Sequence, residues 1–570
     1  MEISEKLTDS PKPAPDLEKS CPKDFDENKP VTAVEKKMQP KLFDAWIQEV
    51  RGVSVVYSED IVPDFSSNGE LLSAYSFLDP LKLPGWHKKL IVGIVVLYAI
   101  SGLCLITALS SLIVFIMPDY QRDGITQDQV SNLFTFPNLF LGLGNLISMP
   151  IAVAVGRRPV ILASNVLLFL AAILCATNDD YYWHLGGRML VAFSAAQCQA
   201  LALLITQDIY FLHQRARVFQ VYASAEVLLN SSFVIASSYV ADAFGWRSWY
   251  WLFAGLSGVA MVLTFLFVPE TAYDRPMEAF MSTSPSDTSN LLPATQTDIT
   301  VPTGRCRYPV QRYTATDNNQ TRYEERNFTS NLQIFVRKPT WWRCLFCLKQ
   351  IGQVFLFPHV LWVAISNGLF QGIDISIQMT YAETLVKPPY NWANTSVSLI
   401  QLGQILVALL CVPLIGWLSD YVIRLCARRN QGIHEPEQRL IAWILPMIAA
   451  LILTLLYGYV LKNPDQYHWM AIVSVVDGFL IVLMGINTVG MAYLIDSHPG
   501  FAGAILVALP VTRGLVGFGL SKHTTEYIAN IGPVKTFGIY AAVSAAFCFL
   551  GIVLYFTAKR VRSLCARMTQ

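Results

Sequence analysis

Long uncharged apolar runs recur along this chain and constrain its fold more than any other feature. An α-helix needs about 20 apolar residues to cross the hydrocarbon core of a bilayer, and twelve runs of the sequence approach or exceed that length. Only 15% of the 570 residues are charged, against about a quarter in soluble proteins. The runs predict an all-α membrane protein with twelve transmembrane helices. The predicted spans are residues 90–117, 130–155, 160–177, 185–206, 218–241, 249–268, 353–383, 397–418, 440–461, 469–495, 502–520 and 536–557.

The spans fall into two groups of six, separated by a long polar stretch. Residues 1–85 mix charged residues, Pro and Ser without helical periodicity, which predicts a disordered cytoplasmic tail and a segment leading into the first span. Residues 86–268 form the predicted N-terminal six-helix half, and residues 353–558 form the C-terminal one. Residues 269–352 are predicted to be a cytoplasmic linker, and residues 559–570 a cytoplasmic tail. Six spans plus six predict an internally repeated architecture.

The basic residues between spans indicate the orientation in the membrane. Arg157, Arg158 and Arg560 fall on the side to which an even number of spans brings both termini, whereas Asp179 lies on the opposite side. Because basic loops stay on the cytoplasmic side, we expect both termini to be cytoplasmic and the protein to be multi-pass, in the plasma membrane. Asn394 begins an Asn-Thr-Ser sequence in an outer loop, which makes it a candidate glycosylation site, although the closeness of the next span disfavours its modification.

Two related turns follow the second and the eighth span. The sequence GRRP occupies residues 156–159, and GWLSD at residues 416–420 is followed by Arg424. Basic residues and a glycine wedged between two spans mark a tight cytoplasmic turn. Similar turns at matching places in two halves predict an internally repeated membrane protein, and moving a solute is the function most typical of such proteins.

Four polar side chains share one face of the seventh span. Asn367, Gln371, Asp374 and Gln378 stand at positions i, i+4, i+7 and i+11, which places them on one face of a helix. Polar groups within a span are costly unless they face other helices or water. A water-filled cavity accommodates four of them more readily than a dry helix contact does, so this stripe predicts the lining of a cavity.

Other spans carry polar groups singly or in pairs. An isolated amide or hydroxyl can merely bond one helix to another, so a structural role stays open for each of them. Glu226 and Asp374 are candidate proton carriers, because the protonation of a carboxyl group responds to its solvation. A carboxylate paired permanently with Arg513 would instead be structural, and Asp477 is one possible partner. Together with the stripe, the candidate substrate-binding residues are Asn138, Asn145, Gln199, Asn230, Asn367, Gln371, Gln378, Asp477 and Arg513.

Residues 79–560 resemble the major facilitator superfamily. The GRRP turn is similar to the basic end of the loop motif that follows the second span in that family, and the later copy keeps Gly416, Asp420 and Arg424. The first copy departs from the motif, with Val153 at its acidic position. The resemblance implies that the two halves rock about a site near the bilayer midplane. It also implies a family-motif arginine, Arg188, and an inner gate braced by ion pairing among Arg157, Arg158, Asp420 and Arg424.

Seven short sequences narrow the resemblance. Three of them resemble fungal drug:proton antiporters, namely DPLKLPGW at 79–86, FGWRSWYW at 244–251 and PETAYDRP at 269–276. The other four are DIYFLHQ at 208–214, PPYNWANTS at 388–396, ARRNQGIHEPEQRL at 427–440 and AYLID at 492–496. Together they are similar to the fungal transporter subfamily whose best-known member imports histidinol and polyamines.

The acids within the spans decide what the resemblance implies about the substrate. Cationic substrates of this subfamily require carboxylates in the first and fourth spans, whereas here the first span has none and the fourth has Gln197 and Gln199. A multiply charged cation would lack compensating charge, so the cavity suits a neutral or weakly charged amphipathic molecule. The predicted function is proton-coupled export of such a molecule, a secondary metabolite or a drug. Uptake of a small organic cation or nutrient is the alternative, and a membrane receptor that does not transport is a more remote one.

Nothing in the sequence pattern favours catalysis or a cofactor. The eight histidines are dispersed, and Cys344 and Cys347 have no second pair at zinc spacing, so no enzyme activity, metal or cofactor is expected. Those two thiols are interpreted as juxtamembrane groups open to acylation. A net charge of +1 does not favour nucleic acid as a partner. The expected partners are a small-molecule substrate, protons and the lipid bilayer, and the protein is expected to be a monomer.

Overall fold

Helices make up the regular secondary structure of the described part of the chain. The computed structural model describes residues 83–210, 212–271, 332–335, 339–411, 414–415, 417–418, 421, 425, 436–498 and 501–568. Nearly all of the tail predicted for residues 1–85 and most of the predicted linker lie outside these residues.

Two spans of the N-terminal half are interrupted. The first span divides at Ala108 into α4 and α5, and the short 3-10 segment η3 divides the fourth span into α8 and α9. The helices of this half are α4 (Gly85–Thr107), α5 (Leu109–Arg122), α6 (Gln127–Val155), α7 (Arg157–Thr177), α8 (Tyr181–Ala195), η3 (Ala196–Cys198), α9 (Leu201–Ile209), α10 (Leu212–Phe244) and α11 (Arg247–Phe267).

A helix that the sequence analysis did not predict precedes the C-terminal half. α13 (Trp341–Val354) occupies the last part of the stretch predicted to be a cytoplasmic linker and the first residues of the predicted seventh span. The seventh span starts at Pro358 instead of residue 353, because proline has no backbone N–H to continue α13 but suits the first turn of a new helix. The later helices are α14 (Pro358–Val386), η5 (Asn394–Ile400), α15 (Gln401–Leu406), η6 (Val407–Cys411), η7 (Pro436–Trp443), α17 (Ile444–Lys462), α18 (Met470–Ser497), α19 (Ala502–Ser521), α20 (Thr524–Ile531) and α21 (Pro533–Met568).

Twelve helical segments of the described residues are long and apolar enough to cross a membrane. They fall at the twelve predicted places, so the predicted fold class, an all-α membrane protein with twelve spans, is confirmed. Their ends differ from the prediction by several residues in places. α21, for example, continues to Met568, through most of the stretch expected to be a tail.

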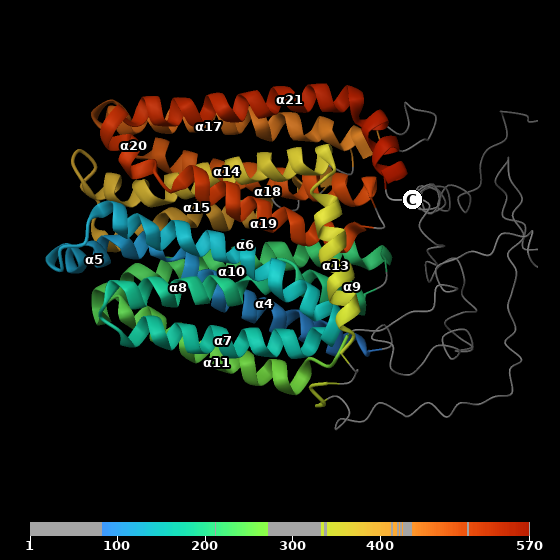
Figure 1. Cartoon of the computed structure of the whole chain (residues 1–570). Coiled ribbons are helices and arrows are strands. Elements are labelled where there is room, and N and C mark those ends of the chain that lie inside the picture. Colours follow the sequence, from blue (N-terminus) through green and yellow to red (C-terminus); the bar gives the residue numbers. More distant parts are fainter. Residues whose placement is uncertain are drawn as a thin grey trace, which may run out of the picture. The chain divides into compact units, whose positions relative to one another are not determined.

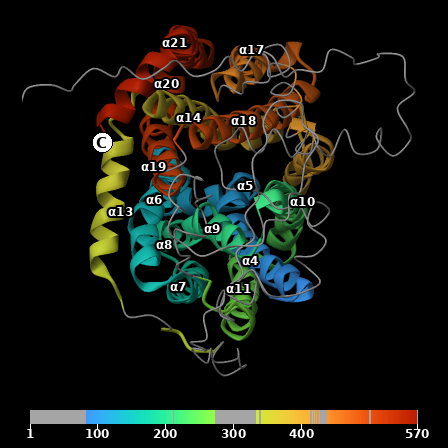
Figure 2. The ribbon, with the colours of Figure 1, turned by 90° about the vertical axis from the view of Figure 1, so that its right-hand side faces the viewer.

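The two halves meet along α6, α19 and α14. In Figure 2, α19 of the C-terminal half lies between α14 of its own half and α6 of the N-terminal half. Glycines permit this close approach: a Cβ at Gly514 would lie 2.8 Å from the carbonyl oxygen of Asn138, and a Cβ at Gly142 would lie 3.1 Å from that of Pro510. A second contact between the halves joins α10 to η5, α15 and η6.

The spans run between two ends of the bundle, which we call the linker end and the distal end. The linker end carries the N-terminus of α4, the C-terminus of α11 and the helix α13. The distal end carries the N-terminus of α6 and the C-terminus of α14. In Figure 1 the linker end is on the right and the distal end is on the left.

Candidate functional site

α14 presents most of its polar stripe to the region between the two halves. Gln371, Asp374 and Gln378 are half-buried, although most of their neighbours along α14 are buried. Tyr381, on the same face and nearer the distal end, lies beside Ser110 of α5. Because α5 belongs to the N-terminal half, this face looks toward the other half and not toward lipid. We call the region beside these three half-buried side chains, between the two halves, the central space.

Asn367, the first residue of the stripe, is placed differently. Its side chain is buried, and its Nδ2 donates to Oδ1 of Asn487 in α18 at 2.6 Å. This is a bond from helix to helix of the kind that polar groups within spans commonly form. The stripe therefore contains one residue that ties α14 to α18 and three that line the central space.

Two carboxyl groups and a phenol come together between α14, α15 and α18. Asp374 interacts with Gln378, one turn further along its helix. The hydroxyl of Tyr381 lies within electrostatic range of both Asp374 and Asp477. Gly403 makes room for Asp477, because a Cβ at that position would overlap the carboxylate. Three segments of the C-terminal half thus bring two acids to one place.

A third acid, Glu226, comes from the N-terminal half. It is half-buried on α10 and interacts with Tyr222 of the same helix and with Arg513 of α19. The acid that acts on Arg513 is Glu226, and among the described residues no ion pair joins Arg513 to Asp477. The ion pair of Asp477 with Arg513 that the sequence left open is therefore not formed. Arg513 of the C-terminal half instead interacts electrostatically with Glu226 of the N-terminal half.

Of the two amides predicted on the second span, only Asn138 lies at the contact between the halves. It is half-buried, and a Cβ at Gly517 of α19 would lie 2.9 Å from its Nδ2. Asn145 is buried and donates through Nδ2 to the Leu141 carbonyl of its own helix at 3.2 Å. Asn145 is thus engaged within α6, whereas Asn138 is placed where the halves move against each other in any rocking motion.

Asn230 and Gln199 lie beside the two interrupted spans. The Oδ1 of Asn230 accepts a hydrogen bond from Oγ1 of Thr107 at 3.1 Å, and Thr107 is exposed although it ends α4 in the middle of the first span. Gln199 follows η3 and is half-buried. The neighbouring Gln197 is buried and donates to Ser148 of α6. Gln199 therefore stays a candidate for the substrate path, and Gln197 bonds helices together.

Arg188 braces the N-terminal half. Its Nε donates to the Leu133 carbonyl at 3.0 Å, and its Nη1 and Nη2 donate to the carbonyls of Leu105 and Ile106 at 3.0 and 3.1 Å. Leu133 stands four residues before Pro137, which has no N–H to offer it. Leu105 and Ile106 precede the break after α4, where carbonyls lose their helical partners. The buried guanidinium supplies donors that lipid cannot supply.

A buried network beside Arg188 was not predicted from the sequence. The ring nitrogens of His184, one turn earlier on α8, lie 2.7 Å from the Tyr120 hydroxyl and 2.9 Å from the Tyr250 hydroxyl. Arg188 donates to that same Tyr250 hydroxyl at 3.0 Å, and the Trp246 ring lies 5.2 Å from the His184 ring. The i, i+4 spacing of His184 and Arg188 and the aromatic sequence FGWRSWYW are the signals that could have revealed it.

The GRRP turn pairs with acids of its own half. The Glu270 carboxylate accepts from the backbone N–H groups of Arg157 and Arg158 at 2.9 and 3.1 Å, at the N-terminus of α7, where negative charge is favoured. The Nε of Arg157 lies 3.3 Å from Oδ2 of Asp208. Gly156 has φ +126°, and a Cβ there would overlap Glu270. Acids from PETAYDRP and DIYFLHQ thus replace the acid missing from the first copy of the motif.

Asp420 and Arg424, the other members of the predicted inner gate, lie outside the described residues. Their pairing with Arg157 and Arg158 stays a prediction.

Side-chain hydrogen bonds join the two halves from the middle of the bundle to the distal end. They fasten the distal ends of the halves together in this conformation. The bonds run from Gln127 Nε2 to Glu383 Oε2 at 2.8 Å, from Thr525 Oγ1 to Asp128 Oδ1 at 3.1 Å, from Lys522 Nζ to Asn132 Oδ1, from Ser398 Oγ to the Ile235 carbonyl at 2.8 Å, and from Ser231 Oγ to Gln404 Oε1 at 3.4 Å.

Asn394, which begins η5, is exposed at the distal end, and its glycosylation stays a prediction.

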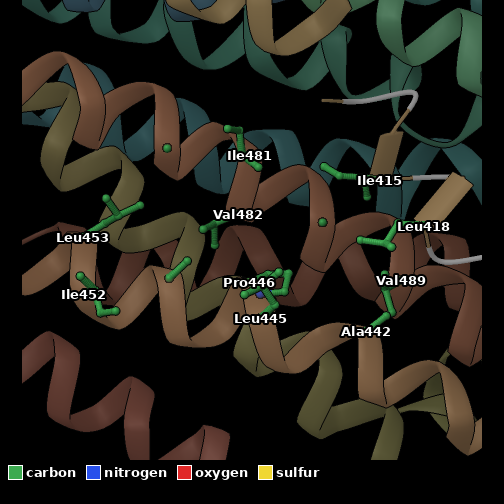
Figure 3. A pocket seen from close by; sticks show the side chains of 13 residues that line it. Ile415, Leu418, Ala442, Leu445, Pro446, Ile452, Leu453, Ile481, Val482 and Val489 are labelled. Carbon is green, nitrogen blue, oxygen red and sulfur yellow. The ribbon is translucent and has the colours of Figure 1, made fainter. Parts of the chain in front are cut away.

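An apolar groove of about 440 Å³ lies on the C-terminal half (Figure 3). Residues from the segment 415–418, α17 and α18 line it, among them Ile415, Pro446, Leu453 and Val482. A solute site needs a few polar groups to orient its ligand, and this lining is apolar throughout. None of the residues predicted from the sequence to bind substrate lines the groove.

Twelve apolar spans in two halves, with acids and amides gathered where the halves meet, define a multi-pass membrane transporter. The family model of the Major Facilitator Superfamily matches residues 98–521. The chain therefore belongs to the major facilitator superfamily, as its resemblance implied.

Similar proteins occur in fungi. The chain is 23% identical over 466 residues to an uncharacterised MFS-type transporter of Schizosaccharomyces pombe, covering 78% of this chain and 80% of the relative. It is 22% identical over 550 residues to Protein HOL1 of Saccharomyces cerevisiae, covering 86% and 89% of the two chains. It is 23% identical over 431 residues to the MFS-type transporter penM of Penicillium rubens, covering 74% and 75%. Transport, as opposed to catalysis, is thus the activity for which most of these relatives are named.

Proposed function

We propose that the chain is a proton-coupled secondary transporter that exports an amphipathic small molecule, a secondary metabolite or a drug, by alternating access. The observation that carries the proposal is the position of Asp374. It is half-buried on α14, flanked by Gln371 and Gln378, on the face that looks toward the other half. A carboxyl group so placed can exchange a proton with water in the central space, while the amides beside it bind a polar part of the substrate.

The coupling of proton to motion runs through the contact between the halves. Glu226 of α10 acts on Arg513 of α19 across that contact. An ionised Glu226 attracts the guanidinium and favours the arrangement in which the halves are close. Protonation of Glu226 removes that attraction and lowers the cost of separating them. Asp374 and Glu226 are therefore the proposed proton carriers, and the halves rock about the contact of α6 with α19.

The remaining site residues divide by what they contact. Asn138, Gln199, Asn230, Gln371 and Gln378 are half-buried and form the proposed substrate path. Asn145 and Asn367 form hydrogen bonds within their own halves, and we propose that they hold the helices that carry the path in place.

The proposed orientation places the linker end in the cytoplasm. The GRRP turn lies at that end, and basic loops stay on the cytoplasmic side. The hydrogen bonds between the halves fasten the distal end, so in this conformation substrate would enter from the cytoplasm. An exporter binds its substrate from that side before it opens to the outside. We propose further that the protein acts as a monomer in the plasma membrane.

Uptake of a small organic cation is a second candidate. Glu226, Asp374 and Asp477 provide three carboxyl groups near the contact of the halves, whereas Arg513 provides one opposing charge there. An excess of acid lowers the cost of accepting a cation from water.

Transport in inside-out vesicles from yeast cells that express the chain separates these candidates. With an acidic lumen, export predicts that vesicles accumulate rhodamine 6G or radiolabelled fluconazole above vesicles lacking the chain, and that a protonophore abolishes the difference. The import candidate predicts instead that whole cells accumulate radiolabelled spermidine and that the vesicles accumulate neither drug. Vesicles and cells that show no flux of any probe would contradict both candidates.

A further inference from the structure

α13 crosses the bundle at its linker end. In Figure 1 it runs steeply across the direction of the spans, and in Figure 2 it lies along one side of the bundle. It packs on α6 of the N-terminal half and on α19 of the C-terminal half. The backbone N–H of Thr340, which precedes it, donates to the Ala154 carbonyl near the end of α6 at 3.0 Å. α13 is therefore held where the spans leave the membrane.

One face of α13 is buried against the bundle. Cys347, Ile351 and Val354 are 8%, 2% and 0% exposed and follow one another at helical spacing. Burial and the neighbouring Cys344 raise the pKa of Cys347 to about 11, so this thiol stays protonated and is a poor nucleophile. The acylation expected for the Cys344 and Cys347 pair is thus disfavoured at Cys347, and any attachment to the membrane must come from the opposite face.

The opposite face is also apolar, yet it is exposed. Five large side chains, Trp341, Trp342, Leu345, Phe346 and Leu348, are 60%, 77%, 59%, 52% and 42% exposed. A surface helix in water carries polar residues on the side away from its core. Contiguous apolar surface of this kind marks a contact with another protein or with a membrane.

Three features identify the bilayer as what covers this face. Tryptophan is typical of the boundary between headgroups and acyl chains, and two stand at the start of α13. The charged residues of the helix are Arg343 and Lys349, both basic, with Lys349 on the exposed side. The helix lies across the spans at their ends, as an interfacial helix does.

We infer that α13 is a membrane-interface helix, which seats the face of Trp341, Trp342, Leu345, Phe346 and Leu348 in the leaflet at the linker end and gathers anionic headgroups around Lys349. Because α13 packs on α6 and α19, it attaches both halves to that leaflet at the level of the GRRP turn.

Tryptophan quenching tests the contact in the full-length protein in nanodiscs. The emission of Trp341 and Trp342 is obtained as the difference between the protein and its Trp341→Phe/Trp342→Phe variant. We expect phosphatidylcholine brominated at carbons 6 and 7 to quench that difference at least twofold more strongly than lipid brominated at carbons 11 and 12, and aqueous iodide to quench it weakly. As a matched control, the difference in emission between the protein and its Trp251→Phe variant reports on an exposed tryptophan of the span α11.

Two results would overturn the inference. Strong quenching of the difference by iodide would place the face in water, and quenching by neither iodide nor bromolipid would mean that another part of the chain covers it. The role of charge is tested with brominated phosphatidylglycerol at the same mole fraction. Brominated phosphatidylglycerol should quench the emission of Trp341 and Trp342 more strongly than brominated phosphatidylcholine does. Lys349→Gln should reduce this additional quenching. Equal quenching by the two lipids would refute the selection of anionic headgroups.

Discussion

Arg188 and Asp374 are both charged residues within spans, and the structure gives them opposite surroundings. The guanidinium of Arg188 is 2% exposed and donates to three carbonyls and a hydroxyl. The carboxyl of Asp374 is half-buried and lies beside the side chain of Gln378. A charge whose partners are all protein groups serves the fold, because any movement would leave those groups unsatisfied in lipid. A charge left facing water is free to exchange a proton or a ligand.

The same contrast extends to other residues of the two halves. In the N-terminal half, His184 and Gln197 are buried and bonded to neighbouring helices. In the C-terminal half, Gln371, Gln378 and Asp477 are half-buried beside the central space. Polarity within a span is therefore a poor guide to function by itself. The number of protein partners around each group is the better guide, and substitutions of these groups test it.

The largest effect is expected from Arg188→Leu. It would leave carbonyls at the α4 break and at Pro137 without donors, and each buried unsatisfied group costs about 1–3 kcal/mol. The sum is comparable with the whole stability of a domain. We expect little monodisperse protein in size-exclusion chromatography, whereas Arg122→Leu, at an exposed position, should behave as the unmodified protein does. A well-folded Arg188→Leu protein that has lost transport alone would reverse the comparison.

Asp374→Asn, in contrast to Arg188→Leu, should reduce transport and leave the fold intact. The substitution keeps the shape of the side chain but removes its titration, so gradient-driven transport should fall at least about tenfold, a loss of about 1.4 kcal/mol in transition-state free energy. The thermal unfolding midpoint and the binding of rhodamine 6G should change little. Asp123→Asn, at an exposed position, is the control. Unchanged transport by Asp374→Asn would remove Asp374 from the coupling mechanism.

Gly514→Ala tests whether the halves move against each other at α6 and α19. The added Cβ would lie 2.8 Å from the Asn138 carbonyl oxygen, and overpacking of this kind costs about 2 kcal/mol. Slower transport and a lower unfolding midpoint are expected. Gly519→Ala adds the same methyl group to α19 at a position where no atom from another part of the structure lies within 4 Å, so it should not lower the unfolding midpoint. Because alanine favours a helix more than glycine does, an equal loss from the two substitutions could not come from helix propensity and would mean that the contact with Asn138 is not responsible.

The smallest effect concerns the interaction between Glu226 and Arg513. Glu226→Gln, Arg513→Gln and the double variant form a thermodynamic cycle, and we expect a coupling of about 1 kcal/mol in the free energy of unfolding. The coupling should be present at neutral pH and fade in acid, where Glu226 is protonated. Glu526→Gln, at an exposed position, serves as the control. Additive effects at neutral pH would show that the two groups do not sense each other.

Much of the candidate site could be predicted from local pattern, and its partners could not. The spacing of Asn367, Gln371, Asp374 and Gln378 places them on one face of a helix wherever that helix packs. The positions of α18 and α5 decide what these residues contact. Asn367 bonds to Asn487 of α18, whereas Asp374 faces the other half, to which α5 belongs. The family motif has its acid at the position of Val153, but here Glu270, just after the sixth span, supplies the carboxylate that binds the GRRP turn.

The sequence by itself determined that this chain crosses a membrane twelve times in two related halves, because the length and polarity of each run decide whether it can lie in lipid. It also determined which side chains share a helical face. Only the tertiary structure decided which of those polar groups are satisfied by protein and which face water, since Arg188 and the Leu105 carbonyl, or Glu226 and Arg513, meet through the packing of helices far apart in the chain.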